Sequence, residues 1–165
     1  MKKRFRFLPL MALAIAISSL SVGAADADGK NDPQDGGVSP VKTYDITRSQ
    51  VAVPRGGGMI ALGGNPTRTA TNSVRDFGSD ADGLAKSEST ITEHYILAAV
   101  NEFIREGVSG EGCIQGTSNA SIISCDTNNI SDPAGAQAWS NWTYHWWHHT
   151  AYIDGEDNVY NYPSF

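Results

Sequence analysis

The sequence predicts an α+β fold: a small antiparallel sheet with more strand than helix, one main amphipathic helix packed on it, and a C-terminal aromatic hairpin. Three observations give this prediction. Residues 43–53 alternate apolar and polar positions, and residues 67–77 are rich in Thr and Val, which is typical of strands. Residues 90–106 carry apolar side chains at helical spacing. The C-terminal stretch contains two aromatic, β-prone runs around Asp154-Gly155.

The first 24 residues have the layout of a secretory signal peptide. Four basic residues precede an apolar run from Leu8 to about Ile17, and Val22-Gly23-Ala24 supplies the small residues that a signal peptidase requires. A membrane anchor is the alternative, but a span needs roughly 20 apolar residues and this run is shorter. We therefore expect cleavage after residue 24, with Ala25-Asp26-Ala27 as a second possible cleavage site. We also expect a mobile tail over 25–42 with little to bury, and a single globular domain over 43–165.

The charge distribution limits the partners. Loss of residues 1–24 changes the formal net charge from −6 to −10, because it removes four basic residues and no acidic one. Arg105 is the last Lys or Arg of the chain. Phosphate backbones and anionic headgroups are held chiefly by Lys and Arg, so we expect no nucleic acid partner. After signal cleavage we expect no integral membrane segment and a secreted or periplasmic location.

The two cysteines agree with export. Cys113 and Cys125 bracket a short segment with apolar residues on either side of a turn-forming centre. In an oxidising compartment two cysteines this close most often pair, and closing a loop of this size contributes about 3 kcal/mol of stability. We expect a disulfide bond across a hairpin or tight loop. A reactive thiol is the alternative, but the chain has neither a C-x-x-C pair nor a nucleophile elbow around Cys113.

The first part of the domain is expected to form strands. Apolar residues alternate over 44–53 and stop at Pro54, which ends a strand because proline lacks the backbone donor. The short apolar run over 59–62 lies between glycine clusters and predicts a buried strand. Residues 67–77 predict a further strand, and 78–83 a turn.

The main helix is expected over residues 90–106. Thr90-Ile91-Thr92-Glu93 matches a capping box. In this motif the Thr90 hydroxyl accepts a hydrogen bond from the backbone N–H of Glu93, and the Glu93 carboxylate accepts one from the backbone N–H of Thr90. Apolar residues then recur at helical spacing, and Gly107 follows as a stop signal; they are Ile96, Ala99, Val100, Phe103 and Ile104. This apolar stripe should pack on the sheet.

The C-terminal part is expected to be mainly extended. Asp132-Pro133 is a good start for a short helix. The following Trp, Thr, Tyr and His residues favour strand over helix, so we expect a strand over 142–153, a turn at Asp154-Gly155 and a second strand over 159–162.

The aromatic residues of this hairpin are the candidate ligand-binding residues. Trp142, Tyr144, Trp146 and Tyr152 should share one face of the strand, and Trp147 should lie on the other. Most of these rings could form the core under the helix. A small domain rarely buries both faces of an edge hairpin, so some rings should remain outside, with Asn141, Asp154 and Asn158 as polar neighbours.

The histidines are a candidate metal site. His145, His148 and His149 form H-x-x-H-H. On a helix these positions would share one face, whereas on a strand His148 points away from the other two and the imidazoles diverge. The expected strand therefore weakens a zinc site, although Glu156 or Asp157 could serve as a base. Without nearby Lys or Arg, we also expect carboxylates to raise the histidine pKa values.

Two functions follow from these observations. The first is an exported, acidic, small binding protein that recognises a glycan, an envelope component or a protein ligand through its C-terminal aromatic surface, without a cofactor. The alternative is a zinc-dependent hydrolase that uses the histidines. The sequence does not decide whether the protein is an enzyme.

Overall fold

The described part of the chain folds almost entirely into β-strands, so the expected α+β class is wrong. The computed structural model describes residues 40–57, 64–105, 110–131 and 138–163. Within these ranges the elements are β1 (Lys42–Val51), the short 3-10 turn η1 (Arg55–Gly57), β2 (Thr67–Asp76), β3 (Asp80–Arg105), β4 (Glu111–Asp126), β5 (Ile130–Ser131), β6 (Trp139–His148) and β7 (Gly155–Asn161). All the ladders between these strands are antiparallel.

Several expected segments lie outside the described residues. These are the leader over 1–24, most of the tail over 25–42, the strand over 59–62 and most of the short helix from Asp132. The described part of the chain contains no helix with the length and apolar character needed to cross a membrane.

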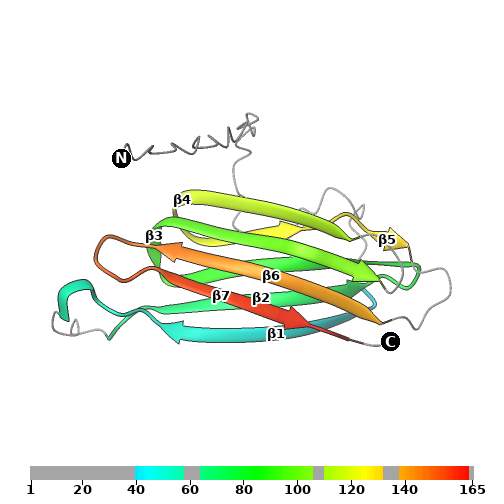
Figure 1. The fold of residues 1–165 in the computed structure, drawn as a ribbon, viewed down its shortest axis with the longest axis horizontal. Helices are drawn as coiled ribbons and strands as arrows, with labels where there is room; N and C mark the ends of the chain where they lie inside the picture. The colour runs from blue at the N-terminus through cyan, green and yellow to red at the C-terminus, as the bar shows by residue number, and fades with distance from the viewer. Residues whose placement is uncertain (1–39, 58–63, 106–109, 132–137, 164–165) are drawn as a thin grey trace, which may run out of the picture.

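Strand β3 is 26 residues long and belongs to two layers of the molecule. Its residues 81–89 pair with β2, and its residues 95–105 pair with β6. Strand β4 pairs with the other side of both halves of β3. The register of this β3–β4 pairing shifts between Glu88 and Glu93 of β3. Such irregularities bend a strand. The long β3–β4 hairpin folds back over itself at this point (Figure 1).

The fold therefore consists of two stacked layers. Layer A contains β1, β2, the first half of β3, the second half of β4 and β5. Layer B contains β7, β6, the second half of β3 and the first half of β4. Figure 1 shows β6 and β7 of layer B in front of β2, with β1 along the lower rim of the molecule. Because β3 and β4 run through both layers, the antiparallel sheet almost closes on itself.

The segment expected as a helix, 90–106, contains the bend and the second half of β3. Ile96, Ala98 and Val100 alternate into the interior, opposite Trp147, His145 and Thr143 of β6 respectively. The residues between them are also apolar, so the spacing fits a helix as well as a strand buried on both faces. The strands on either side of β3 decide between the two, because they satisfy its backbone hydrogen bonds.

The expected capping box has a different role in the structure. The Thr90 hydroxyl accepts a hydrogen bond from the backbone N–H of Thr67, 2.9 Å away. The Glu93 carboxylate accepts two hydrogen bonds from the Arg68 guanidinium, at 2.8 and 3.0 Å, and one from the Ser89 hydroxyl. Both residues connect β2 to the bend of β3, so their spacing reflects tertiary contacts.

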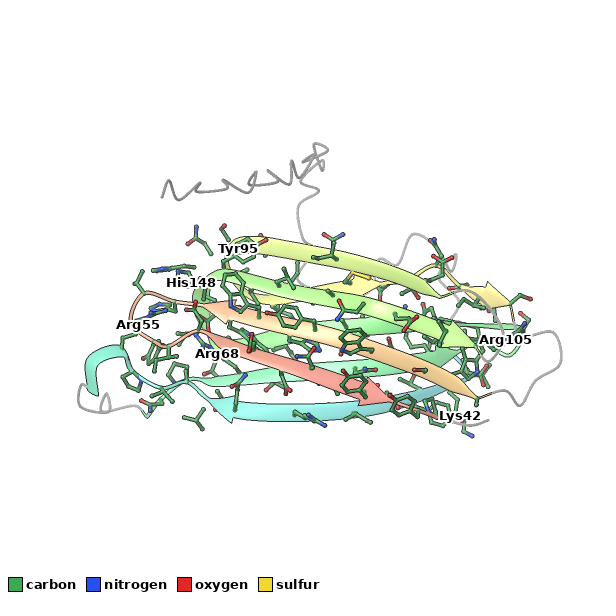
Figure 2. The ribbon with its side chains drawn as sticks, viewed as in Figure 1. Lys42, Arg55, Arg68, Tyr95, Arg105 and His148 are labelled. Atoms are coloured by element: carbon green, nitrogen blue, oxygen red, sulfur yellow. A yellow bond between two sulfur atoms is a disulfide. The ribbon has the colours of Figure 1, made fainter. Side chains whose placement is uncertain are left out.

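The Arg68–Glu93 ion pair lies at the end of the molecule where β3 turns back. Both side chains are buried, with exposed fractions of 1% and 0%. Arg68 also donates to the Ile153 carbonyl in the β6–β7 connection, and it lies so close to Gly155 that a Cβ there would be 3.0 Å from its guanidinium. Figure 2 shows Arg68 at the same end as Tyr95. Arg68 of layer A therefore contacts both the bend of β3 and the β6–β7 connection of layer B.

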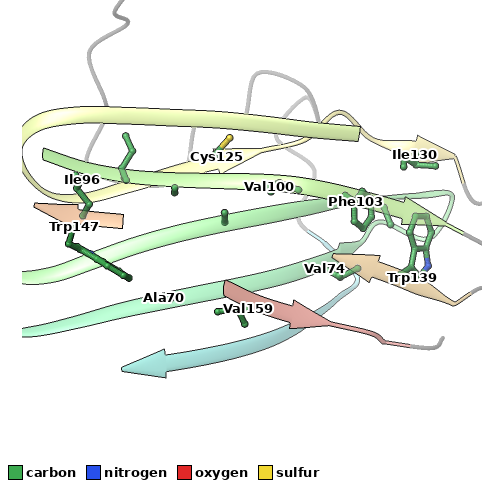
Figure 3. Packing of buried hydrophobic residues seen from close by; sticks show 14 residues of the cluster. Ala70, Val74, Ile96, Val100, Phe103, Cys125, Ile130, Trp139, Trp147 and Val159 are labelled. Carbon is green, nitrogen blue, oxygen red and sulfur yellow. The ribbon is translucent and has the colours of Figure 1, made fainter. Parts of the chain in front are cut away.

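A cluster of buried apolar side chains fills much of the space between the layers (Figure 3). Phe103 stacks on Trp139 with ring centroids 5.1 Å apart. The other members are small or branched residues from both layers, together with Trp147: Ala70, Val74, Ala81, Ala85, Ile96, Ala98, Val100, Ile123, Cys125, Ile130 and Val159. The small residues allow the layers to approach closely. A Cβ at Gly83 would lie 2.8 Å from the Phe103 ring.

Three buried asparagines hold β2 of layer A against layer B. The Asn72 amide donates to the carbonyls of Asn141 and Val159, both at 2.8 Å. The Asn141 amide donates to the Ser73 carbonyl at 2.7 Å, and Asn161 donates to Tyr44 and Asn72 carbonyls. Buried amides are stabilising only when they are hydrogen-bonded, so these contacts fix which residues face each other.

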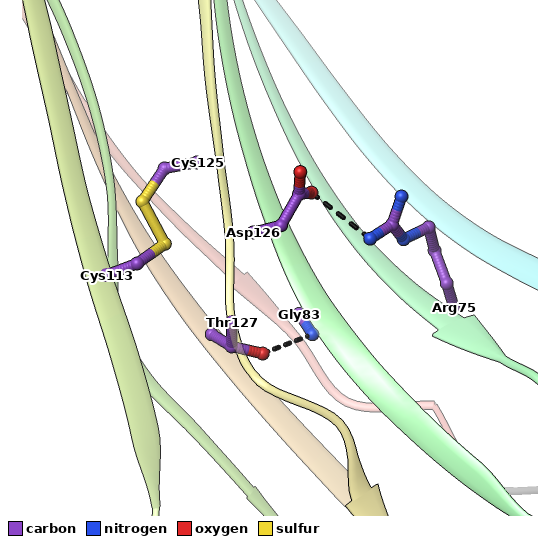
Figure 4. The surroundings of a disulfide bond; sticks show 6 residues. All are labelled: Arg75, Gly83, Cys113, Cys125, Asp126 and Thr127. Carbon is purple, nitrogen blue, oxygen red and sulfur yellow. Dashed lines mark hydrogen bonds and ion pairs between the residues drawn. A yellow bond between two sulfur atoms is a disulfide. The ribbon is translucent and has the colours of Figure 1, made fainter. Parts of the chain in front are cut away.

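The predicted disulfide bond between Cys113 and Cys125 is confirmed (Figure 4). The two cysteines lie on different halves of β4, which bends near Asn119, a residue with a positive φ of 56°. The bond therefore connects layer B to layer A. It closes a loop with a sequence separation of 12, which contributes about 3 kcal/mol in the chain-entropy model.

The buried ion pair gives the first prediction. Glu93→Gln should lower the free energy of unfolding by about 3–5 kcal/mol, because it leaves the Arg68 charge buried without its partner. The double variant Arg68→Met/Glu93→Met should lose less, since it removes both charges. Urea denaturation measures both values. Equal losses in the single and double variants would contradict this assignment.

Candidate functional site

The aromatic and histidine side chains of strand β6 alternate between its inner and outer faces. Its inward residues are Trp139, Asn141, Thr143, His145 and Trp147, all of them buried. Its outward residues are Ser140, Trp142, Tyr144, Trp146 and His148, all of them partly exposed. This strict alternation follows from the two-residue period of a strand. The expected extended conformation of the segment is confirmed up to His148, where the strand ends.

The outward rings of β6 lie beside rings from its neighbouring strands on the outer face of layer B. We call this group of rings the outer aromatic surface; it comprises Tyr95, Trp142, Tyr144, Trp146, His148, Tyr160 and Tyr162. Tyr95 lies 5.5 Å from Trp146 and Trp142 lies 5.6 Å from Tyr160, measured between ring centroids. Exposure rises towards the chain end, to 44% at Tyr160 and 68% at Tyr162.

Polar groups of β7 lie between these rings. The Trp142 indole N–H donates to the Asn158 side-chain oxygen at 3.2 Å, and the Tyr144 hydroxyl donates to Glu156 Oε2 at 3.4 Å. Burial and the charge of Glu156 raise the pKa of Tyr144, so the hydroxyl stays protonated. These contacts orient the rings and leave amide and carboxylate oxygens beside them.

The structure places the five expected ligand-binding residues in three different environments. Trp142, Tyr144 and Trp146 belong to the outer aromatic surface. Trp147 is fully buried, and its indole N–H donates to the Glu88 carbonyl at 3.0 Å. Tyr152 lies in the β6–β7 connection, 5.3 Å from the His149 ring.

Two of the three expected polar neighbours lie beside rings of the outer aromatic surface. Asn158 accepts a hydrogen bond from Trp142, and Asp154, in the β6–β7 connection, contacts His148. Asn141 is buried between the layers instead.

Four residues of the outer aromatic surface lie outside the expected ligand-binding set: His148, which is a candidate metal ligand, and Tyr95, Tyr160 and Tyr162. Tyr95 falls within the expected helix, so the sequence does not predict its position next to β6. Tyr160 and Tyr162 alternate along the expected second strand, and this period-two signal could have placed them beside Trp142. A Cβ at Gly116 would lie 2.2 Å from the Tyr95 hydroxyl. Glycine at this position therefore lets Tyr95 lie across β4.

The three histidines of the H-x-x-H-H motif do not converge. His145 points into the interior, whereas His148 lies on the outer face and His149 follows the end of β6. The described ranges contain no group of three or more His, Cys, Asp or Glu residues arranged to hold a metal ion. The proposed bases are apart from them as well: Glu156 contacts Tyr144, and Asp157 lies 3.6 Å from Arg48.

His148 and His149 instead meet His94 of β3 at one end of layer B. The ring of His149 stacks on that of His94 with centroids 4.4 Å apart, and His148 lies 6.3 Å from His94. Burial and the neighbouring His94 lower the pKa of His149, opposite to the expected rise. The His149 imidazole is therefore mostly neutral near neutral pH.

Asp154 connects this cluster to layer A. Its carboxylate lies 2.8 Å from His148 Nδ1 and 2.5 Å from the Arg55 guanidinium. Partial desolvation by itself would raise the pKa of Asp154, but His148 and Arg55 together outweigh it and lower the pKa. Arg55 also donates to the Tyr152 carbonyl at 2.6 Å. The β6–β7 connection is thus fixed to the segment that follows β1.

His145 takes part in a buried hydrogen-bond chain. The Ser87 hydroxyl donates to the Leu97 carbonyl at 2.7 Å and lies 2.9 Å from His145 Nδ1. His145 Nε2 lies 2.8 Å from the Thr143 hydroxyl. A neutral imidazole with its proton on Nδ1 satisfies both contacts. Burial lowers the pKa of His145 to about 4, so the imidazole is neutral at neutral pH, as this hydrogen-bond chain requires.

This pKa gives a prediction for acid stability. The ordinary histidine pKa is 6.5 and that of folded His145 is about 4, so the unfolded chain takes up a proton first as pH falls. The free energy of unfolding should decrease between pH 6.5 and 4, by about 3 kcal/mol from this group. Urea denaturation across this range measures it. The decrease should be smaller in His145→Gln, and an unchanged decrease would exclude His145 as its source.

No family model, curated protein or solved structure matches this chain. The fold and surface define it as a disulfide-linked, two-layered β-protein with a row of aromatic rings on one outer face. Its function must therefore be argued from that surface.

Proposed function

We propose that the protein is an exported binding protein whose outer aromatic surface holds a glycan of the cell envelope. The single observation that carries this proposal is the row of partly exposed rings along layer B, from Tyr95 through Trp146 and Trp142 to Tyr160. Several neighbouring aromatic rings left partly exposed on one face are uncommon on a protein without a binding partner. The N-terminal leader pattern supports export, and the acidic charge disfavours anionic ligands.

The chemistry of the surface favours a sugar. The face of an aromatic ring carries partial negative charge, which attracts the weakly positive C–H groups of a pyranose ring. The oxygens of Asn158 and Glu156 lie beside these rings and can accept hydrogen bonds from sugar hydroxyls. A neutral or amino-substituted glycan suits the net negative charge of the chain best. Protein interfaces also use Trp and Tyr, so a protein ligand is the other outcome of the test.

Removal of a ring tests this proposal. Trp146→Ala and Tyr160→Ala should each weaken binding to isolated neutral cell-wall polysaccharide by at least about tenfold, or about 1.4 kcal/mol. Calorimetric titration measures the affinity, and circular dichroism measures folding. Tyr160 is exposed enough that its loss should leave the fold intact.

Phe77→Ala is the matched control. Phe77 is a partly buried ring between β2 and β3, beside Arg75 and outside the outer aromatic surface, so its loss should leave affinity unchanged. Equal affinity in all three variants and the parent protein would refute the glycan proposal. Selective binding of an envelope protein, with no binding of polysaccharide, would show that the ligand is a protein and not a glycan.

The zinc-dependent hydrolase remains the alternative, and elemental analysis tests it. The orientation of His145 away from His148 weighs against a shared metal ion, so we expect purified protein to contain no stoichiometric zinc. Near-stoichiometric zinc that is lost in His148→Ala would favour the hydrolase. His94→Ala provides a comparison, because His94 lies in the same cluster but outside the H-x-x-H-H motif.

A further inference from the structure

The first half of β4, residues 111–120, forms an edge of layer B. It pairs with β3 along one side, and in the described ranges no strand pairs along its other side. Figure 1 shows this segment as the outermost strand of the front layer. An edge strand presents unpaired backbone N–H and C=O groups that can pair with another strand.

The edges formed by β1 and β7 lie beside each other and are covered. The Arg48 side chain of β1 donates to the Asn158 carbonyl of β7 at 3.4 Å, and Gln50 donates to the Glu156 carbonyl at the same distance. Asn161 of β7 donates to the Tyr44 carbonyl of β1 at 2.7 Å. These side chains occupy backbone groups of both edges, so neither edge is free to accept a strand.

The β4 edge lacks the features that normally prevent strand pairing. Proteins protect edges with Lys, other charges or Pro. Residues 112–125 contain no charged residue and no proline, and charges occur only at the ends of the strand, at Glu111 and Asp126. Ile114 exposes 59% of its surface beside this edge. The edge is therefore neutral and partly apolar in a protein that is otherwise strongly acidic.

We propose that this edge pairs with the same edge of a second copy of the chain. Two identical strands pair antiparallel about a twofold axis, which gives a closed, self-complementary contact. Like charges oppose contact between copies through most of the acidic surface, but the neutral stretch over 112–125 brings no like charges together. The exposed Ile114 side chains become covered by the pairing.

Pairing of this kind extends layer B across two molecules. In a continuous sheet a twofold axis perpendicular to the sheet keeps the same face of each copy on the same side. Both outer aromatic surfaces then face in one direction, as a bivalent ligand requires. The pairing itself does not depend on the proposed glycan function. An edge of about ten residues is a small interface, so the dimer should form in a concentration-dependent way.

Two measurements on the purified protein test the pairing. Analytical ultracentrifugation should show a monomer–dimer equilibrium. Hydrogen–deuterium exchange should show amide protection over residues 111–120 that rises with protein concentration. The double variant Gln115→Glu/Ser118→Glu, at two exposed positions of the edge, should lose both the dimer and the concentration-dependent protection, because it places like charges across the twofold contact.

The control variant Ser79→Glu/Thr150→Glu adds the same charge at exposed positions away from the edge, and it should still dimerise. Three results would overturn the proposal: a monomer at every concentration, a dimer that persists in the edge variant, or protection of 111–120 that does not change with concentration. The last result would mean that another part of the same chain covers the edge.

Discussion

The buried ion pair between Arg68 and Glu93 is the interaction on which the rest of the structure depends. It lies where β3 leaves layer A and enters layer B, and Arg68 also holds the β6–β7 connection through the Ile153 carbonyl. Two charges out of water are stable only when each satisfies the other. The pair therefore selects the one arrangement in which β2, the bend of β3 and the end of β6 meet. Because β4 pairs with both halves of β3, the bend of β3 also bends β4. The disulfide bond between Cys113 and Cys125 then joins the two halves of β4, and with them the two layers.

The interior between the layers contains polar as well as apolar side chains, and the polar side chains make the stacking specific. Apolar contacts alone would tolerate sliding of one layer over the other, because they have little directionality. The amides of Asn72, Asn141 and Asn161 donate to named carbonyls across the gap. The chain from Ser87 through His145 to Thr143 adds a further fixed contact. A shift of one residue would leave several buried polar groups without partners.

The same alternation that fills this interior also forms the outer surface. Strand β6 contributes Trp139 and Trp147 to the core and Trp142 and Trp146 to the outside, so one short segment supplies both stability and the candidate binding face. The histidines are divided in the same way, and this division separates the residues of the H-x-x-H-H motif. Layer B thus presents an aromatic face that ends at the neutral edge of β4, whereas the edges of β1 and β7 cover each other.

Some features were determined by the sequence alone. The local patterns predicted strands near β1, β2, β6 and β7, the opposite faces of Trp146 and Trp147, and the disulfide bond, because strand period and cysteine proximity are properties of short segments. The nature of β3 was decided by tertiary structure. Its second half has apolar residues on both faces and fits either period, so only the hydrogen bonds offered by β4 and β6 made it a strand. For the same reason the meeting of Glu93 with Arg68, of Tyr95 with Trp146 and of His94 with His149 could not be predicted. Each pair joins residues that are distant in the chain and becomes close only after the long hairpin folds back.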